Sequence, residues 1–149
     1  MAPQDIHYQK YLIALTKSSF LKDSSRESLE ELLNQMSEEL WKTKNFKSSL
    51  EVSSTFYFIV SGKLKVFKSN PESGREHTVF VLSKGDVFDV LSLLDSKPHD
   101  VYWEALDQLV VLKIPMDQMR LWINKYPVMH KAILYYLGDR MRQLMDVAT

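Results

Sequence analysis

Residues 57–68 read YFIVSGKLKVFK. Four bulky apolar residues come first, Gly62 follows shortly after, and from Leu64 onward apolar residues alternate with lysine. β-Branched and aromatic side chains favour strands, glycine permits positive φ in a turn, and alternation is typical of a strand with one exposed face. The segment therefore predicts a strand, a glycine turn and a second, half-exposed strand.

Turn signals and short apolar runs repeat on the C-terminal side of this segment. Proline and glycine mark a turn at residues 70–74 (NPESG), and proline marks another at 95–98 (DSKP). The mostly apolar residues 87–94 lie between further expected strands at 78–82, 101–103 and 109–114. Short strands at this spacing, separated by turns, indicate an all-β sandwich or barrel.

Helical periodicity appears at both ends of the chain. Apolar residues spaced three and four apart predict a helix over about residues 5–17, and a second helix in which Ser24 and Glu27 fit a capping box. A short amphipathic helix is expected at 116–125, and Pro127 is placed to open a last helix that runs to about Asp146. Helices, then strands, then helices give an α+β fold class.

The last helix carries a regular apolar stripe, made of Leu134, Leu137, Met141, Leu144 and Ala148. Their alternating spacing of three and four is typical of a coiled-coil seam. Two heptads are also compatible with a stripe that packs against the chain's own core. The pattern alone therefore leaves a dimer interface and an intramolecular contact both open.

Composition excludes several classes of function. The 149 residues suit one domain, and 19 basic residues balance 19 acidic ones, without the basic excess typical of phosphate-gripping proteins. The absence of cysteine excludes disulfides, thiolate nucleophiles and cysteine-ligated clusters. The sequence shows no apolar run of membrane-spanning length, no secretory signal, and no glycine-rich phosphate loop, G-x-S-x-G or H-E-x-x-H motif. We expect a cytoplasmic protein that has no membrane partner and is not an enzyme.

Five segments, taken in order, resemble the cyclic nucleotide-binding domain of the Crp/Fnr regulators. They are an entry helix (20–32), a hairpin written Y-x-I-x-x-G-x-[VL]-x-V in the family (57–66), a phosphate-binding cassette (85–98), a closing strand and helix (109–127) and a dimer helix (140–144). The resemblance implies a double-stranded β-helical jelly roll with N-terminal helices and a long C-terminal dimerisation helix. It divides the chain into an N-terminal helical extension (1–19), the β-roll with flanking helices (20–126) and the start of the dimerisation helix (127–149). It also favours the dimer reading of Leu134, Leu137, Met141 and Leu144.

In the family the cassette reads roughly G-[ED]-x-[FI]-G-E-x-[SA]-L-L-x-x-x-P-R-[ST]-A. Its glutamate accepts a hydrogen bond from the ribose, and its arginine pairs with the cyclic phosphate. Here Asp89 stands for the second glycine, Val90 for the glutamate and His99 for the arginine. By this resemblance the residues of the degenerate pocket are Gly85, Asp86, Asp89, Val90, Leu91, Ser92, His99 and Asp100.

These exchanges keep the cassette's backbone pattern and remove its grip on an anion. Val90 cannot bind a hydroxyl group, and Asp89 and Asp100 place carboxylates where a phosphate needs donors. His99 carries charge only below about pH 6.5, and an imidazolium lacks the bidentate fork of arginine. We therefore expect that cyclic AMP or cyclic GMP is not bound in the usual way.

Two readings of the pocket remain. It either takes a different effector, which is a neutral, cationic or aromatic small molecule or a metal held by Asp89, His99 and Asp100. Or it is filled and ligand-free, with Val90, Leu91 and Val101 packed as core and the carboxylates facing solvent. We favour the filled pocket, and we expect no resident cofactor. Haem would need an axial ligand from His7, His77, His99 or His130, and surface histidines are far commoner than axial ligands.

The family's regulators continue past the dimer helix into a helix-turn-helix domain, whereas this sequence stops at Thr149 inside the helix. We expect the effector-sensing and dimerisation part of a longer regulator, which contacts DNA only through a C-terminal domain missing here. A change in the cassette would then move the last two helices. The alternatives are a stand-alone or relic module that acts as a constitutive dimerisation or protein-interaction domain, and a cyclic-nucleotide sensor with a rewired pocket.

Overall fold

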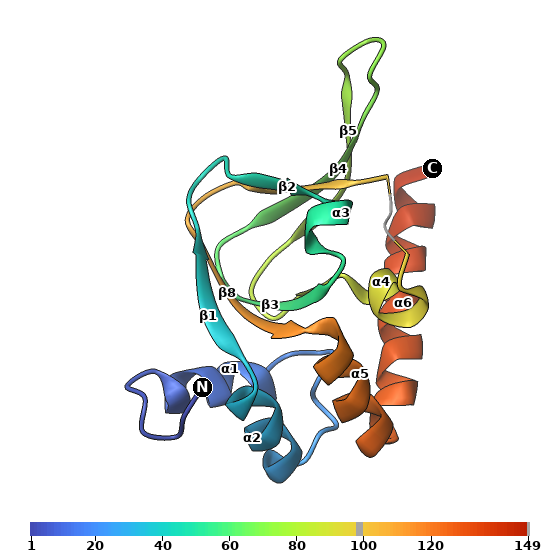
Figure 1. The fold of residues 1–149 in the computed structure, drawn as a ribbon. Helices are drawn as coiled ribbons and strands as arrows, with labels where there is room; N and C mark the ends of the chain where they lie inside the picture. Colours follow the sequence, from blue (N-terminus) through green and yellow to red (C-terminus); the bar gives the residue numbers. More distant parts are fainter. Residues whose placement is uncertain (98–99, 149) are drawn as a thin grey trace.

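The computed structural model describes residues 1–97 and 100–148 of the chain. Within these residues two helices come first, eight strands interrupted by two short helices follow, and two helices close the chain (Figure 1). The helices are α1 (Tyr8–Thr16), α2 (Arg26–Asn34), α3 (Ser49–Val52), α4 (Val90–Asp95), α5 (Met116–Lys125) and α6 (Val128–Ala148). The strands are β1 (Ser37–Trp41), β2 (Phe46–Ser48), β3 (Thr55–Ser61), β4 (Leu64–Ser69), β5 (Glu76–Leu82), β6 (Val87–Phe88), β7 (Tyr102–Ala105) and β8 (Leu109–Pro115).

The strands form two four-stranded antiparallel sheets. One has the order β1-β8-β3-β6 and the other the order β2-β7-β4-β5. Pairings such as β1 with β8 and β2 with β7 join strands far apart in the sequence, as expected of a jelly roll. Two such sheets with flanking helices confirm the predicted α+β jelly-roll class, including its long C-terminal helix.

The segment around Gly62 links the two sheets and does not close a hairpin. β3 pairs with β6 and β8, whereas β4 pairs with β5 and β7, so the family-style hairpin expected at residues 57–66 is wrong in its pairing. Gly62 has φ +95°, and a Cβ there would lie 2.5 Å from the carbonyl oxygen of Gln108. Glycine is required because the chain crosses from one sheet to the other against another stretch of backbone.

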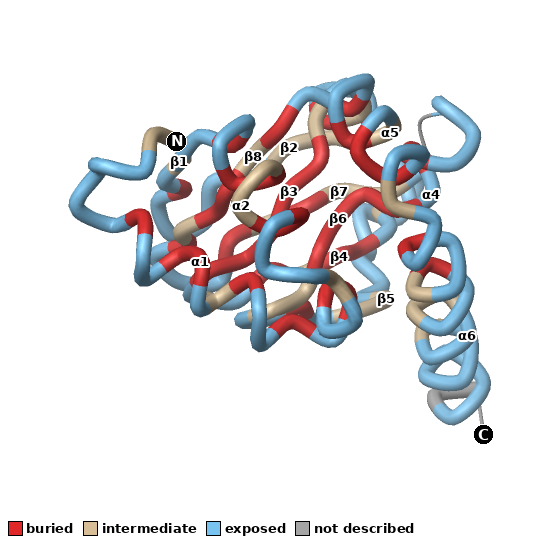
Figure 2. Tube along the Cα trace, turned by 90° about the horizontal axis from the view of Figure 1, so that it is seen from below, coloured by how far each residue is buried: buried red, intermediate tan, exposed pale blue. Residues whose placement is uncertain are grey.

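The long apolar runs of β3 and β8 are buried on both faces (Figure 2). Phe58 on β3 and Leu112 on β8 face a core that they share with α1, α2, α5 and the start of α6. Ile59 and Val111, their neighbours in sequence, face a second core between the two sheets. Side chains of a strand alternate between faces, so a strand covered on both sides reads as one continuous apolar run.

Several local expectations are corrected. The N-cap of α2 is Ser25, whose side chain accepts a hydrogen bond from the backbone N–H of Ser28, and Ser24 does not cap the helix. β3 begins at Thr55, two residues before the stretch that predicted it, and residues 49–52 form the short helix α3, which was not predicted. The sequence did not predict β1 or β2. In β1 only Trp41 is buried, so β1 lacks the apolar pattern of a strand, and its pairing with β8 determines its structure.

α6 presents most of its apolar stripe to solvent (Figure 2). Leu134 and Met141 are 69% and 64% exposed, Leu144 is 44% exposed, and Leu137 is half-buried against the helical core. Met129 and Ile133, in the first turns of the helix, are buried. None of the helices in the described residues combines the length and the apolar character needed to cross a bilayer.

Candidate functional site

The cassette residues form a turn at Gly85–Asp86, the two-residue strand β6 and the helix α4, which lies beside α6 (Figure 1). Asp89 is the N-cap of α4: its Oδ1 accepts from the backbone N–H of Ser92 at 3.3 Å, and its Oδ2 accepts from the Ser92 hydroxyl at 2.7 Å. The Asp89 residue is only 3% exposed and Ser92 is fully buried. The chain thus places a carboxylate of its own at the first turn of the cassette helix.

The C-terminal end of α4 is held by Arg120 from α5. The Arg120 guanidinium donates from Nε to the carbonyl oxygen of Leu93 at 3.0 Å and from Nη2 to that of Ser92 at 2.8 Å. Its Nη1 also pairs with Asp117 at 2.9 Å. The Ser92 carbonyl also accepts from the backbone N–H of Ser96 at 2.9 Å, so Arg120 adds further donors at the negative end of the helix and ties the short α4 to α5.

The remaining pocket residues are spread over different environments. Val90 is buried, whereas Leu91 is 49% exposed, so the expected packing of Leu91 in the core is wrong. We expected both carboxylates to face solvent. This holds for Asp100, which is exposed. It is wrong for Asp89, because the Asp89 carboxylate is buried and caps α4. His99 lies outside the described residues, and with it the metal set that would include it.

Aromatic side chains occupy the space between the sheets behind β6. Phe88 stacks on Tyr57 with ring centroids 4.6 Å apart and on Trp103 at 4.9 Å. Trp41 meets Tyr57 and Phe88 edge-on at 5.8 and 5.9 Å. Within the described residues the indole N–H groups of Trp41 and Trp103 are buried without an acceptor. Burial, the largest cause, raises the pKa of the Tyr57 hydroxyl to about 12, so this aromatic cluster is uncharged at neutral pH.

A charged cluster joins the two sheets near these rings. The Glu39 carboxylate on β1 receives Lys47 of β2 at 3.1 Å and Lys113 of β8 at 2.8 Å. Burial raises the pKa of the Glu39 carboxyl, but hydrogen bonds from both lysines outweigh it and leave the pKa below its ordinary value. Glu39 is therefore ionised at neutral pH and serves as a tie between the sheets.

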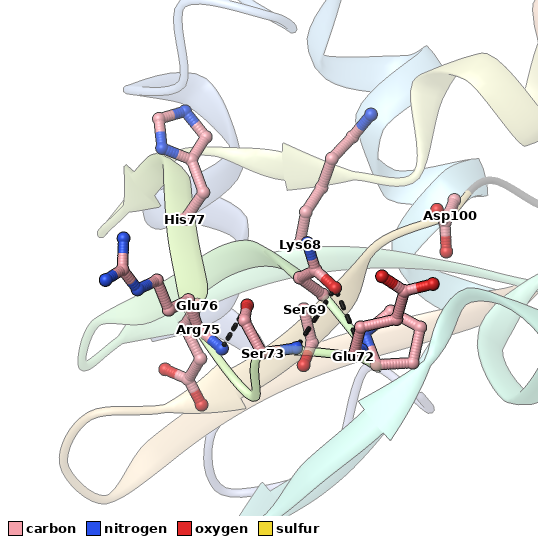
Figure 3. Close-up of a pocket in the computed structure, with 10 residues that line it drawn as sticks. Lys68, Ser69, Glu72, Ser73, Arg75, Glu76, His77 and Asp100 are labelled. Carbon is pink, nitrogen blue, oxygen red and sulfur yellow. Dashed lines mark hydrogen bonds between the residues drawn. The ribbon is translucent and has the colours of Figure 1, made fainter.

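A wide surface hollow lies on the β4–β5 hairpin, away from α4. Figure 3 shows its lining, which is Lys68, Ser69, Asn70, Pro71, Glu72, Ser73, Arg75, Glu76, His77 and Asp100. Basic and acidic side chains are mixed there, so the lining favours no charge of ligand. Of the predicted pocket residues that the structure describes, Asp100 alone reaches it. The hollow is therefore separate from the cassette.

Sequence reasoning missed two arginines that contact the cassette, Arg120 and Arg140. Arg140 of α6 forms an ion pair with Asp86 at 2.7 Å. Both arginines lie far along the chain from the residues they contact, and the matched segments that contain them, 109–127 and 140–144, gave no sign of these contacts. Among residues 1–97 and 100–148, no three His, Asp or Glu side chains are placed to hold a metal ion.

Residues 48–126, just over half of the chain, match the cyclic nucleotide-binding domain, and the chain belongs to that family. Over 93 residues, or 62% of the chain, it is 28% identical to the CRP-like cAMP-activated global transcriptional regulator of Mycobacterium tuberculosis, with 41% of that protein covered. The chain thus spans about two fifths of the length of the curated relatives that it matches. The resemblance to Crp-like regulators is confirmed.

Solved structures agree with this fold. The sensor domain of the transcriptional regulator DNR from Pseudomonas aeruginosa aligns with a TM-score of 0.75 at 17% identity, covering 93% of each chain. The regulatory subunit of a cAMP-independent protein kinase A from Trypanosoma cruzi, solved bound to guanosine, aligns with a TM-score of 0.71 at 17% identity, covering 89% of this chain and 48% of that one. At such identities the likeness concerns the fold alone.

Proposed function

We propose that the chain is the effector-sensing and dimerisation domain of a Crp/Fnr-type transcription regulator, and that it does not bind cyclic AMP in the usual way. The observation that carries the proposal is the buried carboxylate of Asp89 at the first turn of α4. In this proposal DNA contact belongs to a segment outside residues 1–149, and the domain has neither an enzymatic role nor a resident cofactor.

The position of Asp89 is unfavourable for a cyclic phosphate. Two like unit charges about 4 Å apart repel by about 4 kcal/mol at an effective dielectric constant of about 20, so a carboxylate beside a phosphate opposes its binding. The nearby Val90 side chain offers no hydrogen bond. Among the described residues two arginines contact the cassette, but their guanidinium groups are already bound to the protein, Arg120 to carbonyls of α4 and Arg140 to Asp86. A phosphate entering here would meet repulsion without a compensating guanidinium.

An uncharged effector suits the surroundings better. The buried cluster between the sheets is aromatic, and the indole N–H groups of Trp41 and Trp103 are donors without a protein acceptor among the described residues. The Trypanosoma cruzi neighbour was solved bound to guanosine, a nucleoside without a phosphate. A neutral, ring-shaped compound with hydrogen-bond acceptors is therefore the effector class that we infer for this domain.

A second candidate function is a constitutive dimerisation module with a relic pocket. One observation favours it: the rings of Trp41, Tyr57, Phe88 and Trp103 pack against one another with at most 6% of any residue exposed. Such packing fills the space between the sheets without any ligand, although with other residues than those of the filled-pocket reading, which named Val90, Leu91 and Val101. The two functions share the dimer and differ only in whether a small molecule stabilises the domain.

The stripe on α6 supports dimerisation. Leu134, Met141 and Leu144 are exposed on one helix, and Tyr135 and Met145 beside them are 58% and 63% exposed. Apolar residues at heptad spacing gain stability when a second copy of the helix removes them from water. The exposed stripe therefore favours a homodimer formed through α6.

The test combines a thermal-shift screen with analytical ultracentrifugation. Cyclic AMP and cyclic GMP at millimolar concentration should leave the melting temperature unchanged, whereas a true effector raises stability by RT ln(1 + [L]/Kd). Adenosine and guanosine probe the uncharged class: a shift supports sensing, and a flat result supports the constitutive module. Micromolar stabilisation by cyclic AMP would contradict the proposal and revive the rewired cyclic-nucleotide sensor.

The dimer has its own test. The double variant Leu134→Glu, Met141→Glu should sediment as a monomer at concentrations where the parent is a dimer. The matched control is Leu50→Glu, because Leu50 on α3 is 74% exposed yet lies off the stripe. A parent chain that stays monomeric at high concentration, or a control that dissociates equally, would contradict dimerisation through α6.

A further inference from the structure

Arg140 stands where α6 leaves the β-roll. The first turns of α6 are anchored by Met129 and Ile133, which are buried, and Tyr136 follows on the same side. Residues 141–146, which come directly after Arg140, are all exposed (Figure 2). Arg140 is therefore the last residue of α6 whose described side chain is shielded from water.

The contacts of Arg140 are numerous and well shielded. Its Nη2 lies 2.7 Å from Asp86 Oδ1 and donates to the Tyr136 hydroxyl at 3.0 Å. The guanidinium also lies over the rings of Phe80 and Tyr136, with centroid distances of 5.4 and 4.9 Å. The side chains of Arg140 and Asp86 are only 17% and 23% exposed, so water screens the attraction between them less than it screens an ion pair on the surface.

The partner carboxylate is itself fixed to the cassette. Asp86 Oδ2 accepts from the backbone N–H of Ser83 at 2.8 Å, and the carbonyl oxygen of Asp86 accepts from Ile59 on β3 at 2.9 Å. The Tyr136 hydroxyl of α6 donates to the carbonyl oxygen of Val87, the next residue, at 3.0 Å. Two side chains of α6 thus bind consecutive residues at the start of the cassette.

We propose that Arg140 is a positioning residue that sets the direction in which α6 leaves the domain, through its ion pair with Asp86. This rests on the proposed function, because that direction determines how two copies of α6 cross. A helix rises about 1.5 Å per residue, so a small tilt at Arg140 is carried over about 12 Å to Ala148. A displacement of the turn that holds Asp86 therefore becomes a displacement of the dimer helix.

The experiment measures the direction of α6 within one chain. The protein has no cysteine, so Lys42→Cys and Met145→Cys, both at exposed positions, accept spin labels cleanly. Dilution with unlabelled protein confines the measured distance to one chain. The parent should give one narrow distance distribution, and Arg140→Gln and Asp86→Asn should each broaden or shift it. The reversed pair Asp86→Arg, Arg140→Asp should recover the narrow distribution.

A control variant on α6 and the results that would overturn the proposal complete the experiment. Arg142→Gln removes an exposed arginine two residues further on and should leave the distribution unchanged. An unchanged distribution in folded Arg140→Gln and Asp86→Asn would overturn the proposal, as would failure of the reversed pair to recover it. Ultracentrifugation of the parent tests dimerisation separately, so a monomeric parent would count against the proposed function while the distances still decide the role of Arg140.

Discussion

Replacing Asp89 with alanine removes the group that organises the cassette helix. The variant loses an N-cap, which contributes about 1 kcal/mol, and a hydrogen bond from the buried Ser92 hydroxyl to a charged acceptor, which contributes about 1.5–3 kcal/mol. Because the two contributions share one side chain and are not additive, we expect a loss of about 2–3 kcal/mol in the free energy of unfolding. For a chain of this size, that lowers the melting temperature by roughly 5–10 °C.

The assay is urea unfolding followed by tryptophan fluorescence. Asp89→Asn keeps an acceptor for the cap and should lose less than about 1 kcal/mol. Asp95→Ala is the matched control, since Asp95 ends the same helix, is exposed, and accepts a hydrogen bond from the backbone N–H of Lys97 at 2.9 Å. If Asp89→Ala were as stable as the parent, or no less stable than Asp95→Ala, the carboxylate would not hold the cassette and the reasoning would be refuted.

Three further predictions concern the supports of the fold. Arg120→Ala removes the guanidinium donors to the carbonyls of Ser92 and Leu93 and should speed amide hydrogen exchange in α4 about tenfold; unchanged exchange would show that the guanidinium does not stabilise this helix. Glu39 has a lowered pKa in the folded state, so its contribution is present above its ordinary pKa of 4.5 and is lost as pH falls through the lower folded value. Glu39→Gln should therefore reduce the decrease of the urea midpoint between pH 7 and pH 3. An equally large decrease in the variant would contradict the proposed role of Glu39 in joining the two sheets. Gly62→Ala should lower the unfolding free energy by more than about 1 kcal/mol in thermal melts, because φ is +95° and the new Cβ meets the Gln108 carbonyl oxygen; a parent-like melt would contradict the close approach.

The sequence predicted helices and strands correctly where the local residue pattern and the tertiary environment favour the same structure. β3 and β8 are rich in β-branched and aromatic residues and lie between two cores, so pattern and environment both favour strands. The helix at Met116–Lys125 was predicted with the same bounds that the structure gives, since its apolar face is regular. Gly62 marked a turn correctly, although the partners of the two flanking strands depend on distant residues.

Elements and contacts set by long-range pairing were not predictable. β1 contains two consecutive glutamates and became a strand because β8 offers a free edge to pair with. In the site, the exchange of a family glycine for Asp89 indicated repulsion of anions, but not that the carboxylate would cap α4. Arg120 and Arg140 reach the cassette across 27 and 54 residues of sequence, and no local spacing signals such a contact.

The most direct measurement follows the three indole N–H resonances by ¹⁵N NMR while cyclic AMP is added. Trp103 stacks on Phe88 beside the cassette, whereas the Trp122 indole N–H donates to the carbonyl oxygen of Ser28 at 2.8 Å in the helical core and serves as the internal reference. Tryptophan-to-phenylalanine variants assign the three signals. We predict that none moves up to millimolar cyclic AMP. A saturable shift of the Trp103 signal at micromolar concentration, with Trp122 unchanged, would contradict the account.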